Sequence, residues 1–352
     1  MSSPAKNKSP HNILFIPSGS IGDALMMLGL CGEIIDYQPD AKVTIIARRN
    51  GVLIKDLARA YPRIQVHVIQ KDIHGAWTLV WESFRRPYTA LMPAAFGLSA
   101  VWNTELFFKI LSWRPGTVTA GLLKKEGDQS PYQRSEVYTL SILHFDSLRR
   151  LARLGGLEVA PEGSTVSLKL ATQTPQRFLD ISKKYIVFHP FGSSSWKSWP
   201  PRRSKELLAW LRSAYPQLPI VVTAANENEA EAKEITQGIA NTEVLVNLPV
   251  LELAGVIQHS GVYIGVDTGI THLTGVLNAK SVVMAHLTGP SWLPKYNPNA
   301  KILINDENCA CDGNKGGNCR IDVDGKPYLR CLYDIKDEWI QRAVGDFLPP
   351  IQ

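Results

Sequence analysis

A short polar motif, Asp267-Thr268-Gly269, follows the apolar run 261–264, which has the composition of a buried strand. His272 stands in the first turn of the helix that is expected next. Helix-start amide groups lack intrahelical partners, so together with the Thr268 hydroxyl they are suited to binding an anion such as a diphosphate. Aspartic proteases use the same Asp-Thr-Gly triplet, but they are all-β proteins, whereas strands and helices alternate around this motif.

A second polar loop follows the strand-like run 185–190. Ser193, Ser194 and Lys197 offer short hydroxyl donors and one mobile positive charge, which together suit a phosphate-binding loop. The GK[ST] spacing of a Walker loop is missing, and a serine-rich surface loop before a helix is the alternative interpretation.

Asp23 follows the first strand-like run, 12–17, in the glycine-containing segment SGSIGD. The two glycines allow a tight turn and a close approach of ligand to backbone, although they do not spell the GxGxxG dinucleotide fingerprint. Asp23 is therefore either a common helix-start acid, stabilised by the helix dipole, or a general base.

Two acids follow the strand-like run 220–224 and could bind a ribose. A carboxylate at the end of a strand can accept hydrogen bonds from both ribose hydroxyl groups, and Glu227 and Glu229 are placed about equally well for this. The alternative is that these acids only occupy the first turn of a helix, where the helix dipole stabilises negative charge.

The elements that must position these residues alternate along the chain. Strands are expected at 12–17, 42–47, 65–69, 185–190, 220–224, 244–248, 262–266 and 281–287, and helices at 22–37, 53–60, 202–214, 227–238, 251–259 and 270–278. This alternation predicts two doubly wound α/β units, in which ligands bind at the carboxyl ends of the strands. The expected division is a disordered tail at 1–11, domains at 12–175 and 176–335, and a C-terminal helix within 336–352 that could pack back on the N-terminal domain.

The composition is that of a globular protein: 352 residues, 45% hydrophobic and 20% charged. No apolar run reaches the roughly 20 residues of a membrane helix, and the polar N-terminus lacks the apolar centre of a signal peptide, so a cytoplasmic location is expected. The net charge of +6 favours anionic partners, but no nucleic-acid-binding motif is present, and nucleic acid is not an expected partner.

Four segments, in order along the chain, resemble glycosyltransferase family 9, the ADP-heptose:lipopolysaccharide heptosyltransferases. They are ILFIPSGSIGDALMMLGL, HPFGSSSWKSWPPRRSKELLAWL, ELAGVIQHSGVYIGVDTGITHLTGVLNAKSVVMAHLTGPS and the C-terminal CAC…NC…CLYDI. The third segment is the most specific, whereas residues 70–165 match the family poorly.

The resemblance implies a GT-B fold, in which two Rossmann-like domains face each other across a cleft and bind the acceptor and the nucleotide sugar. It also implies inverting, metal-independent transfer of a heptose from ADP-heptose to a lipopolysaccharide inner-core sugar on the cytoplasmic face of the inner membrane. Asp23 falls on the family's proposed base, Lys197 on its phosphate-binding lysine, and Asp267-Thr268-Gly269 with His272 on the diphosphate loop. Another nucleotide sugar, a protein or other glycan acceptor, or nucleotide binding without transfer are the alternatives.

Acceptor recognition is expected where the family match is poor, because tryptophan and basic residues gather there in a pattern that suits an anionic glycolipid at a membrane surface. An amphipathic helical insert with its own core is the alternative. The residues of the tryptophan-rich and basic region are Trp77, Trp81, Arg85, Arg86, Trp102, Trp113, Arg114, Lys124 and Lys125, and the expected acceptor-binding residues are Gly22, Arg48, Arg85 and Arg86.

Four cysteines, Cys309, Cys311, Cys319 and Cys331, cluster in the segment 305–331. A cytosolic location favours a structural zinc or iron site over disulfides, but the spacing is not that of a standard zinc ribbon, and structural thiols without a metal are the alternative. Asp322-Val323-Asp324 has the DxD pattern of metal-dependent glycosyltransferases, but its glycine-rich surroundings favour a solvated turn.

Overall fold

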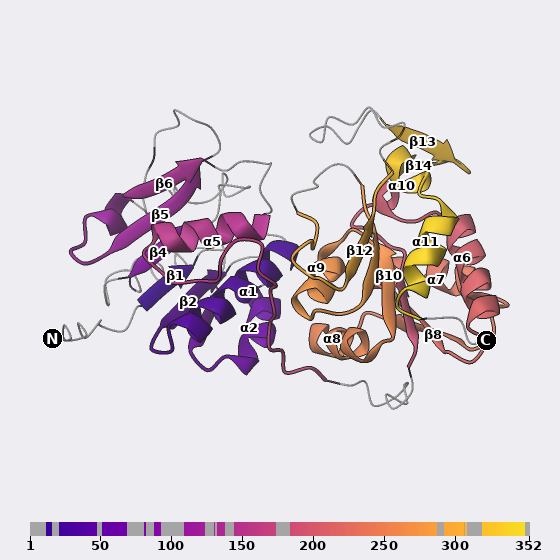
Figure 1. Ribbon diagram of the computed structural model, residues 1–352, viewed down its shortest axis with the longest axis horizontal. Coiled ribbons are helices and arrows are strands. Elements are labelled where there is room, and N and C mark those ends of the chain that lie inside the picture. Colours follow the sequence, from indigo (N-terminus) through magenta and orange to yellow (C-terminus); the bar gives the residue numbers. More distant parts are fainter. Residues whose placement is uncertain are drawn as a thin grey trace. The chain divides into compact units, whose positions relative to one another are not determined.

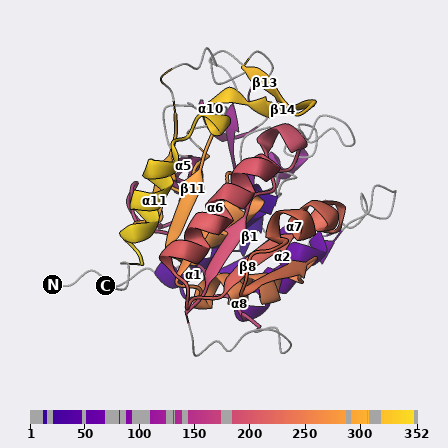
Figure 2. The same cartoon turned by 90° about the vertical axis from the view of Figure 1, so that its right-hand side faces the viewer.

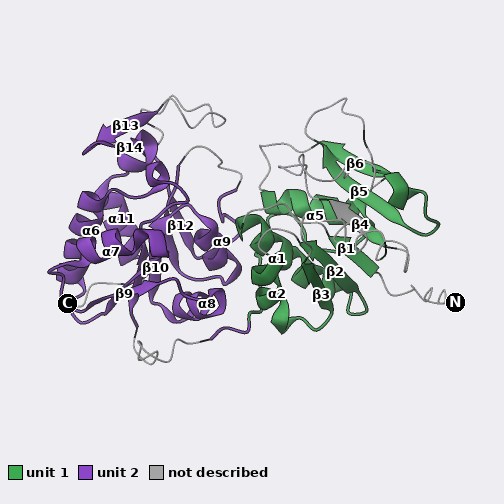
Figure 3. Cartoon of the chain, turned by 180° about the vertical axis from the view of Figure 1, so that it is seen from behind, with its two compact units in different colours: residues 1–170 green, residues 171–352 purple. Residues whose placement is uncertain are grey.

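The computed structural model places the chain in two compact units, residues 1–170 and 171–352 (Figure 3). The expected boundary, after residue 175, lies close to this division. The structure describes residues 12–15, 21–47, 51–68, 81, 88–92, 109–123, 130, 132–137, 144–173, 184–286, 292–305, 307 and 319–348.

The first unit contains a parallel sheet in the order β3-β2-β1-β4-β5-β6. This is the strand order of the Rossmann fold. The elements are β1 (Asn12–Phe15), α1 (Ile21–Tyr37), β2 (Lys42–Ala47), α2 (Gly51–Leu57), the 3-10 helix η1 (Ala58–Ala60), β3 (Ile64–Val68), β4 (Thr89–Met92), β5 (Val118–Leu123), β6 (Arg134–Val137) and α5 (His144–Leu154).

A buried ion network fixes α1 in this unit. Arg149 of α5 has a fully buried side chain and donates hydrogen bonds to Glu33 of α1 (Nη2 to Oε2, 3.0 Å) and to Asp146 (Nη1 to Oδ1, 3.0 Å). The Ala160 amide donates to the other oxygen of Glu33 at 2.6 Å. The network therefore ties α5 and the segment that follows it to the helix that carries Asp23 in its first turn.

The second unit repeats the same topology, with the parallel order β12-β11-β10-β7-β8-β9. Because β7 is the first strand and the later strand β10 lies on its other side, the strand order reverses between β7 and β10. The elements are β7 (Ile186–His189), η2 (Ser195–Lys197), α6 (Pro201–Ala214), β8 (Ile220–Ala224), η3 (Asn226–Asn228), α7 (Glu229–Thr236), β9 (Thr242–Val246), α8 (Val250–His259), β10 (Val262–Val266), α9 (Gly269–Val276), β11 (Ser281–Met284), β12 (Ala300–Leu303), β13 (Arg320–Val323), β14 (Lys326–Leu329), α10 (Arg330–Tyr333) and α11 (Asp337–Gly345).

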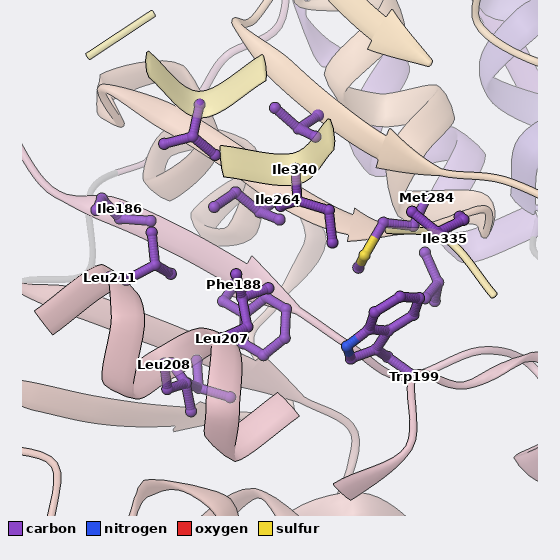
Figure 4. Packing of buried hydrophobic residues seen from close by; sticks show 14 of the residues in the cluster. Ile186, Phe188, Trp199, Leu207, Leu208, Leu211, Ile264, Met284, Ile335 and Ile340 are labelled. Atoms are coloured by element: carbon purple, nitrogen blue, oxygen red, sulfur yellow. The ribbon is translucent and has the colours of Figure 1, made fainter. Parts of the chain in front are cut away.

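Helices cover both faces of the second sheet (Figures 1 and 2). On one face, apolar residues of α6, α7, α10 and α11 pack on β7, β8, β10 and β11 in a single core. Figure 4 shows Leu207, Leu208 and Leu211 of α6 beside Ile186 and Phe188 of β7. Helices α8 and α9 serve the other face, where the buried Tyr185 hydroxyl donates to the Val256 carbonyl at 2.7 Å.

The C-terminal helix α11 belongs to the core of the second unit. Ile340, Ala343 and Val344 are buried in the core, and Tyr215 of the second unit donates a hydrogen bond from its hydroxyl to the Leu348 carbonyl at 2.6 Å. The apolar stripe of an amphipathic helix must be covered, and α11 packs against β11 and β12.

The small antiparallel hairpin of β13 and β14 closes with a two-residue turn, Asp324-Gly325. Both turn residues have a positive φ, 53° and 76°, as a tight hairpin turn requires, and the Gly325 amide donates to Asp322 Oδ1 at 3.0 Å. The DxD pattern is thus an exposed hairpin turn, which confirms the sequence-based interpretation.

The remaining differences from the expected elements have local causes. The helix expected at 227–238 is divided into η3 and α7, and Gly238 ends the region with a φ of 82°. Strand β9 ends at Val246, two residues earlier than predicted, because Asn247 adopts a φ of 52°, which lies in the left-handed region and breaks the extended backbone.

Candidate functional site

The loops that follow β7 and β10 flank the point where the strand order reverses, which is the usual ligand position in such sheets. The first loop carries Lys197 and the second carries Asp267, both sequence-predicted donor-binding residues. Burial is the main cause of the shifted pKa values of Asp267 and His286, and the charge of Lys197 also acts on both groups, lowering each pKa. The structure thus gathers residues from three strand ends at one place in the second unit.

The Lys197 loop folds back tightly on itself after β7. The Lys197 amide donates to the Ser194 carbonyl at 2.9 Å, and the Gly192 amide donates to Ser198 Oγ at 2.9 Å. A side chain at Gly192 would bring its Cβ within 2.6 Å of the Lys197 backbone oxygen. Ser194 therefore shapes the loop through its backbone, while Ser193 is exposed at its surface.

The indole ring of Trp196 supports this loop from the side of the β13–β14 hairpin. Lys197 Nζ lies 5.0 Å from the centre of the ring, and the guanidinium carbon of Arg320 in β13 lies 4.6 Å from it. At both distances the negative face of the indole ring can stabilise the cation by a cation–π interaction. The hairpin therefore helps to fix the ammonium group at the site.

The Asp267-Thr268-Gly269 motif opens α9 as a capping box. The Thr268 amide donates to Thr271 Oγ1 at 3.1 Å, and the Ile270 amide donates to Thr268 Oγ1 at 3.2 Å. Among the amides of Thr268, Gly269 and Ile270, that of Gly269 is the one that forms no hydrogen bond within the described residues. Local capping thus satisfies the Thr268 and Ile270 amides at the start of α9.

Asp267 directly follows the carboxyl end of β10, and its side chain is only 12% exposed. Its Oδ1 lies 3.5 Å from Thr271 Oγ1, and its Oδ2 lies 3.6 Å from His286 Nε2. Burial raises the pKa of Asp267 to about 6, against the opposing effect of the Lys197 charge and the Thr271 hydroxyl. Burial, assisted by Lys197, lowers the pKa of His286 to about 4, so the imidazole is neutral near pH 7.

His272 lies three residues beyond Gly269, on the same side of α9, but its imidazole is buried. Its Nδ1 is 3.5 Å from the hydroxyl of Tyr296, and that hydroxyl would lie 2.7 Å from a Cβ at Gly275. This close packing favours a supporting position beneath the helix start.

Two histidines at this site were not identified from the sequence. His189 is the last residue of β7, and its Nδ1 donates to the Thr223 carbonyl at 2.8 Å, with Thr223 Oγ1 at 3.0 Å. Burial lowers the pKa of His189 to about 4. His286 follows β11. In both cases the available signal was a polar residue at the end of a buried strand of the sheet.

The two acids proposed for ribose binding differ in their surroundings. Glu229 is the first residue of α7, and its Oε1 lies 2.6 Å from Lys233 Nζ one turn along the helix. Glu227 is exposed in η3, directly after β8. Within the described residues, the Glu227 carboxylate forms no ion pair, whereas that of Glu229 does.

Asp23 belongs to the first unit, where it lies in the first turn of α1 and is 9% exposed. Gly22 beside it is buried. The other expected acceptor-binding residues, Arg48, Arg85 and Arg86, lie outside the described residues, as do Trp77, Trp102, Lys124 and Lys125 of the tryptophan-rich and basic region. In the same region, Trp81 and Trp113 are exposed.

Of the four clustered cysteines, the structure describes Cys319 and Cys331. Both are buried at the base of the β13–β14 hairpin, where the Arg330 amide donates to the Cys319 carbonyl at 2.8 Å. Cys309 and Cys311 lie outside the described residues. Within the described ranges, no three His, Cys, Asp or Glu side chains are grouped as metal ligands, and no helix has the length and apolar content needed to cross a membrane.

A family model and several relatives are similar to parts of the chain. The profile of "Glycosyltransferase family 9 (heptosyltransferase)" matches residues 146–319. Lipopolysaccharide heptosyltransferase 1 of Salmonella typhimurium is 28% identical over 127 residues, which are 36% of this chain and 40% of that protein. The chain thus matches well under half of the length of this relative.

Two solved structures extend the likeness to nearly the whole chain. E. coli heptosyltransferase WaaC with ADP-2-deoxy-2-fluoro heptose has a TM-score of 0.66 at 18% identity, covering 95% of this chain and 99% of that one. The iron-containing dodecameric glycosyltransferase TibC from enterotoxigenic E. coli has a TM-score of 0.57 at 15% identity, covering 97% and 76%. With both sheets in the Rossmann order, these likenesses confirm the predicted GT-B fold.

Proposed function

Because the chain is a glycosyltransferase family 9-like protein, we propose that it transfers a heptose from ADP-heptose to a lipopolysaccharide inner-core sugar with inversion at the anomeric carbon. The observation that carries this proposal is the convergence of Lys197 and the start of α9 where the second sheet reverses its strand order. A cation and an open helix-start amide at that point suit a diphosphate. The similar WaaC structure contains an ADP-heptose analogue, which supports the choice of donor.

In the proposed reaction, one displacement forms the new bond and breaks the old one. The Asp23 carboxylate takes the proton of an acceptor hydroxyl, whose oxygen attacks the anomeric carbon of the donor. The bond from that carbon to the phosphate oxygen breaks, and ADP leaves with the bonding electrons. The Lys197 ammonium and the Gly269 amide stabilise the negative charge that develops on the diphosphate, so the protein's own groups supply this stabilisation.

Substitution of Asp23 tests the assignment of the base. Asp23→Ala is expected to lower turnover by about 10²–10⁴-fold, because general base catalysis contributes a factor of this size, while the affinity for the donor stays the same. Asp36→Ala is the matched control, since Asp36 lies on the same helix with its side chain 58% exposed. Turnover of Asp23→Ala close to that of the control would refute the assignment.

The donor class is tested by thermal unfolding with ADP-, UDP-, GDP- and dTDP-sugars. A ligand that binds only the folded state raises the melting temperature, so ADP-heptose is expected to give the largest shift. Glu227→Ala should reduce that shift if Glu227 binds the ribose. A larger shift with another nucleotide sugar would overturn the donor assignment and leave the transferase class in place.

The acceptor is proposed to be an anionic glycolipid, bound by the first unit through Gly22, Arg48, Arg85 and Arg86 at the inner-membrane surface. The exposed Trp81 and Trp113 support this proposal, since tryptophan side chains favour the membrane–water interface. Sedimentation with anionic vesicles tests it: binding that weakens with salt is expected, and the absence of binding at low salt would contradict it.

We also propose a structural zinc or iron ion at Cys309, Cys311, Cys319 and Cys331. Cys319 and Cys331 are both buried at the base of the hairpin, where the Arg330 amide donates to the Cys319 carbonyl, and the similar TibC is an iron-containing protein. Such an ion would hold the hairpin in place and take no part in the transfer. Elemental analysis of the purified protein should find one metal ion per chain, and a metal-free folded protein would refute the site.

A further inference from the structure

His286 is a buried imidazole at the proposed donor site to which the reaction outlined above gives no role. It lies two residues after the end of β11, and its side chain is 5% exposed. Strand β11 pairs with β10 in parallel, with Met284 opposite Val266, so the two strands bring His286 and Asp267 to the same edge of the sheet. The result is the 3.6 Å approach between His286 Nε2 and Asp267 Oδ2.

The charges around His286 leave the site in need of a further donor. The charge of Lys197, in the loop after β7, acts on His286. Asp267, which follows β10, lies beside His286, and the Thr271 hydroxyl of α9 contacts Asp267. Tyr263 and Tyr296 also lie near Asp267, and burial raises the pKa of both hydroxyls, so they stay uncharged. Lys197 and Asp267 therefore offset each other, and a diphosphate that enters here brings its negative charge close to a carboxylate.

A third group beside the diphosphate would relieve this repulsion. An imidazole can donate a hydrogen bond from Nε2 while neutral, and a nearby anion favours its protonated form. In a site shielded from water, such a donor stabilises a phosphate oxygen more strongly than it would in solution.

We propose that His286 is a further binding residue for the donor diphosphate, to which its Nε2–H donates a hydrogen bond beside Lys197. This inference rests on the proposed function, because it takes the ligand of the site to be a nucleoside diphosphate sugar.

Calorimetric titration with three probes isolates the contribution of the phosphates: ADP, inorganic pyrophosphate and adenosine. His286→Ala should weaken binding of ADP and pyrophosphate by about tenfold or more, as the loss of a hydrogen bond to a charged group implies, and leave adenosine binding unchanged. His259→Ala is the matched control, because His259 is an exposed histidine of the same unit. His286→Gln, which keeps an N–H donor of similar size, should bind ADP better than His286→Ala.

The outcomes separate this inference from the proposed function. If the wild-type protein, His286→Ala and His286→Gln all bind ADP with the same affinity, the role of His286 alone is overturned. An equal loss of affinity for adenosine and ADP would also overturn it, because a general distortion of the site then explains the loss. Failure of the wild-type protein to bind ADP would refute the proposed donor and, with it, this inference.

Discussion

Gly192 is the position where one added methyl group should disable the donor site. An alanine Cβ would lie 2.6 Å from both the Cβ and the backbone oxygen of Lys197. Carbon atoms in ordinary contact are about 3.5–4.0 Å apart, so the two arms of the loop would have to separate by roughly 1 Å. The neighbouring atoms include backbone, which cannot move aside as the end of a flexible side chain can.

The hydrogen bonds of the loop convert this separation into a displacement of Lys197. Its amide is bound to the Ser194 carbonyl, and the Ser198 amide is bound to the Ser195 carbonyl at 3.0 Å, so η2 moves as one piece. A hydrogen bond to a charged group contributes about 1.5–3 kcal/mol, so loss of the contact between Lys197 and the diphosphate should weaken ADP binding by about 10- to 150-fold. An error of about 1 Å in the position of such a group should also slow transfer by up to about 10²-fold.

Calorimetric titration of Gly192→Ala with ADP measures this effect, and thermal unfolding without ligand reports any general loss of stability. Gly345→Ala is the matched control, because no heavy atom lies within 4 Å of a Cβ at this last residue of α11. The control should bind ADP as the wild type does. An ADP affinity of Gly192→Ala within twofold of the wild-type value would refute the reasoning about the loop.

Two further predictions concern the stability of the fold. Arg149→Ala should lower the free energy of unfolding by about 3–5 kcal/mol in urea denaturation, because it leaves the buried carboxylates of Glu33 and Asp146 without their cation; a loss below about 1 kcal/mol would contradict the role of the network. His189 has a pKa of about 4 in the folded protein and about 6.5 when unfolded, so the unfolded state binds the extra proton and stability is lost as the pH falls from about 6.5 to about 4. This loss, of the order of 3 kcal/mol, should be absent in His189→Gln, and equal slopes of unfolding free energy against pH for the two proteins would argue against a neutral buried His189.

The start of α9 shows how far local sequence reasoning reaches. The apolar run of β10 and the polar triplet after it predict a strand that ends at a helix start, and both elements are present. The number of amide groups open to a ligand could not be predicted, because it depends on the Thr268 and Thr271 rotamers that complete the capping box. These rotamers are set by the packing around α9.

The two acids after β8 illustrate the same limit. Their spacing makes Glu227 and Glu229 equivalent as ribose ligands, since both follow a strand and precede a helix. The helix begins at Glu229, and this places its carboxylate one turn from Lys233, at 2.6 Å. A shift of one or two residues in a helix boundary changes which acid faces a partner, and such boundaries are the least certain part of a sequence-based prediction.

The sequence by itself determined the alternation of strands and helices, the two α/β units and the polar residues that follow the strands. These features are local: periodicity, glycine positions and capping residues act over a few neighbouring residues. Only the tertiary structure decided that β7, β10 and β11 bring Lys197, Asp267 and His286 together, and that α11 completes the core of the second unit. Strand order and burial depend on contacts between segments far apart in the chain, and it is burial that gives Asp267 and His286 their shifted pKa values.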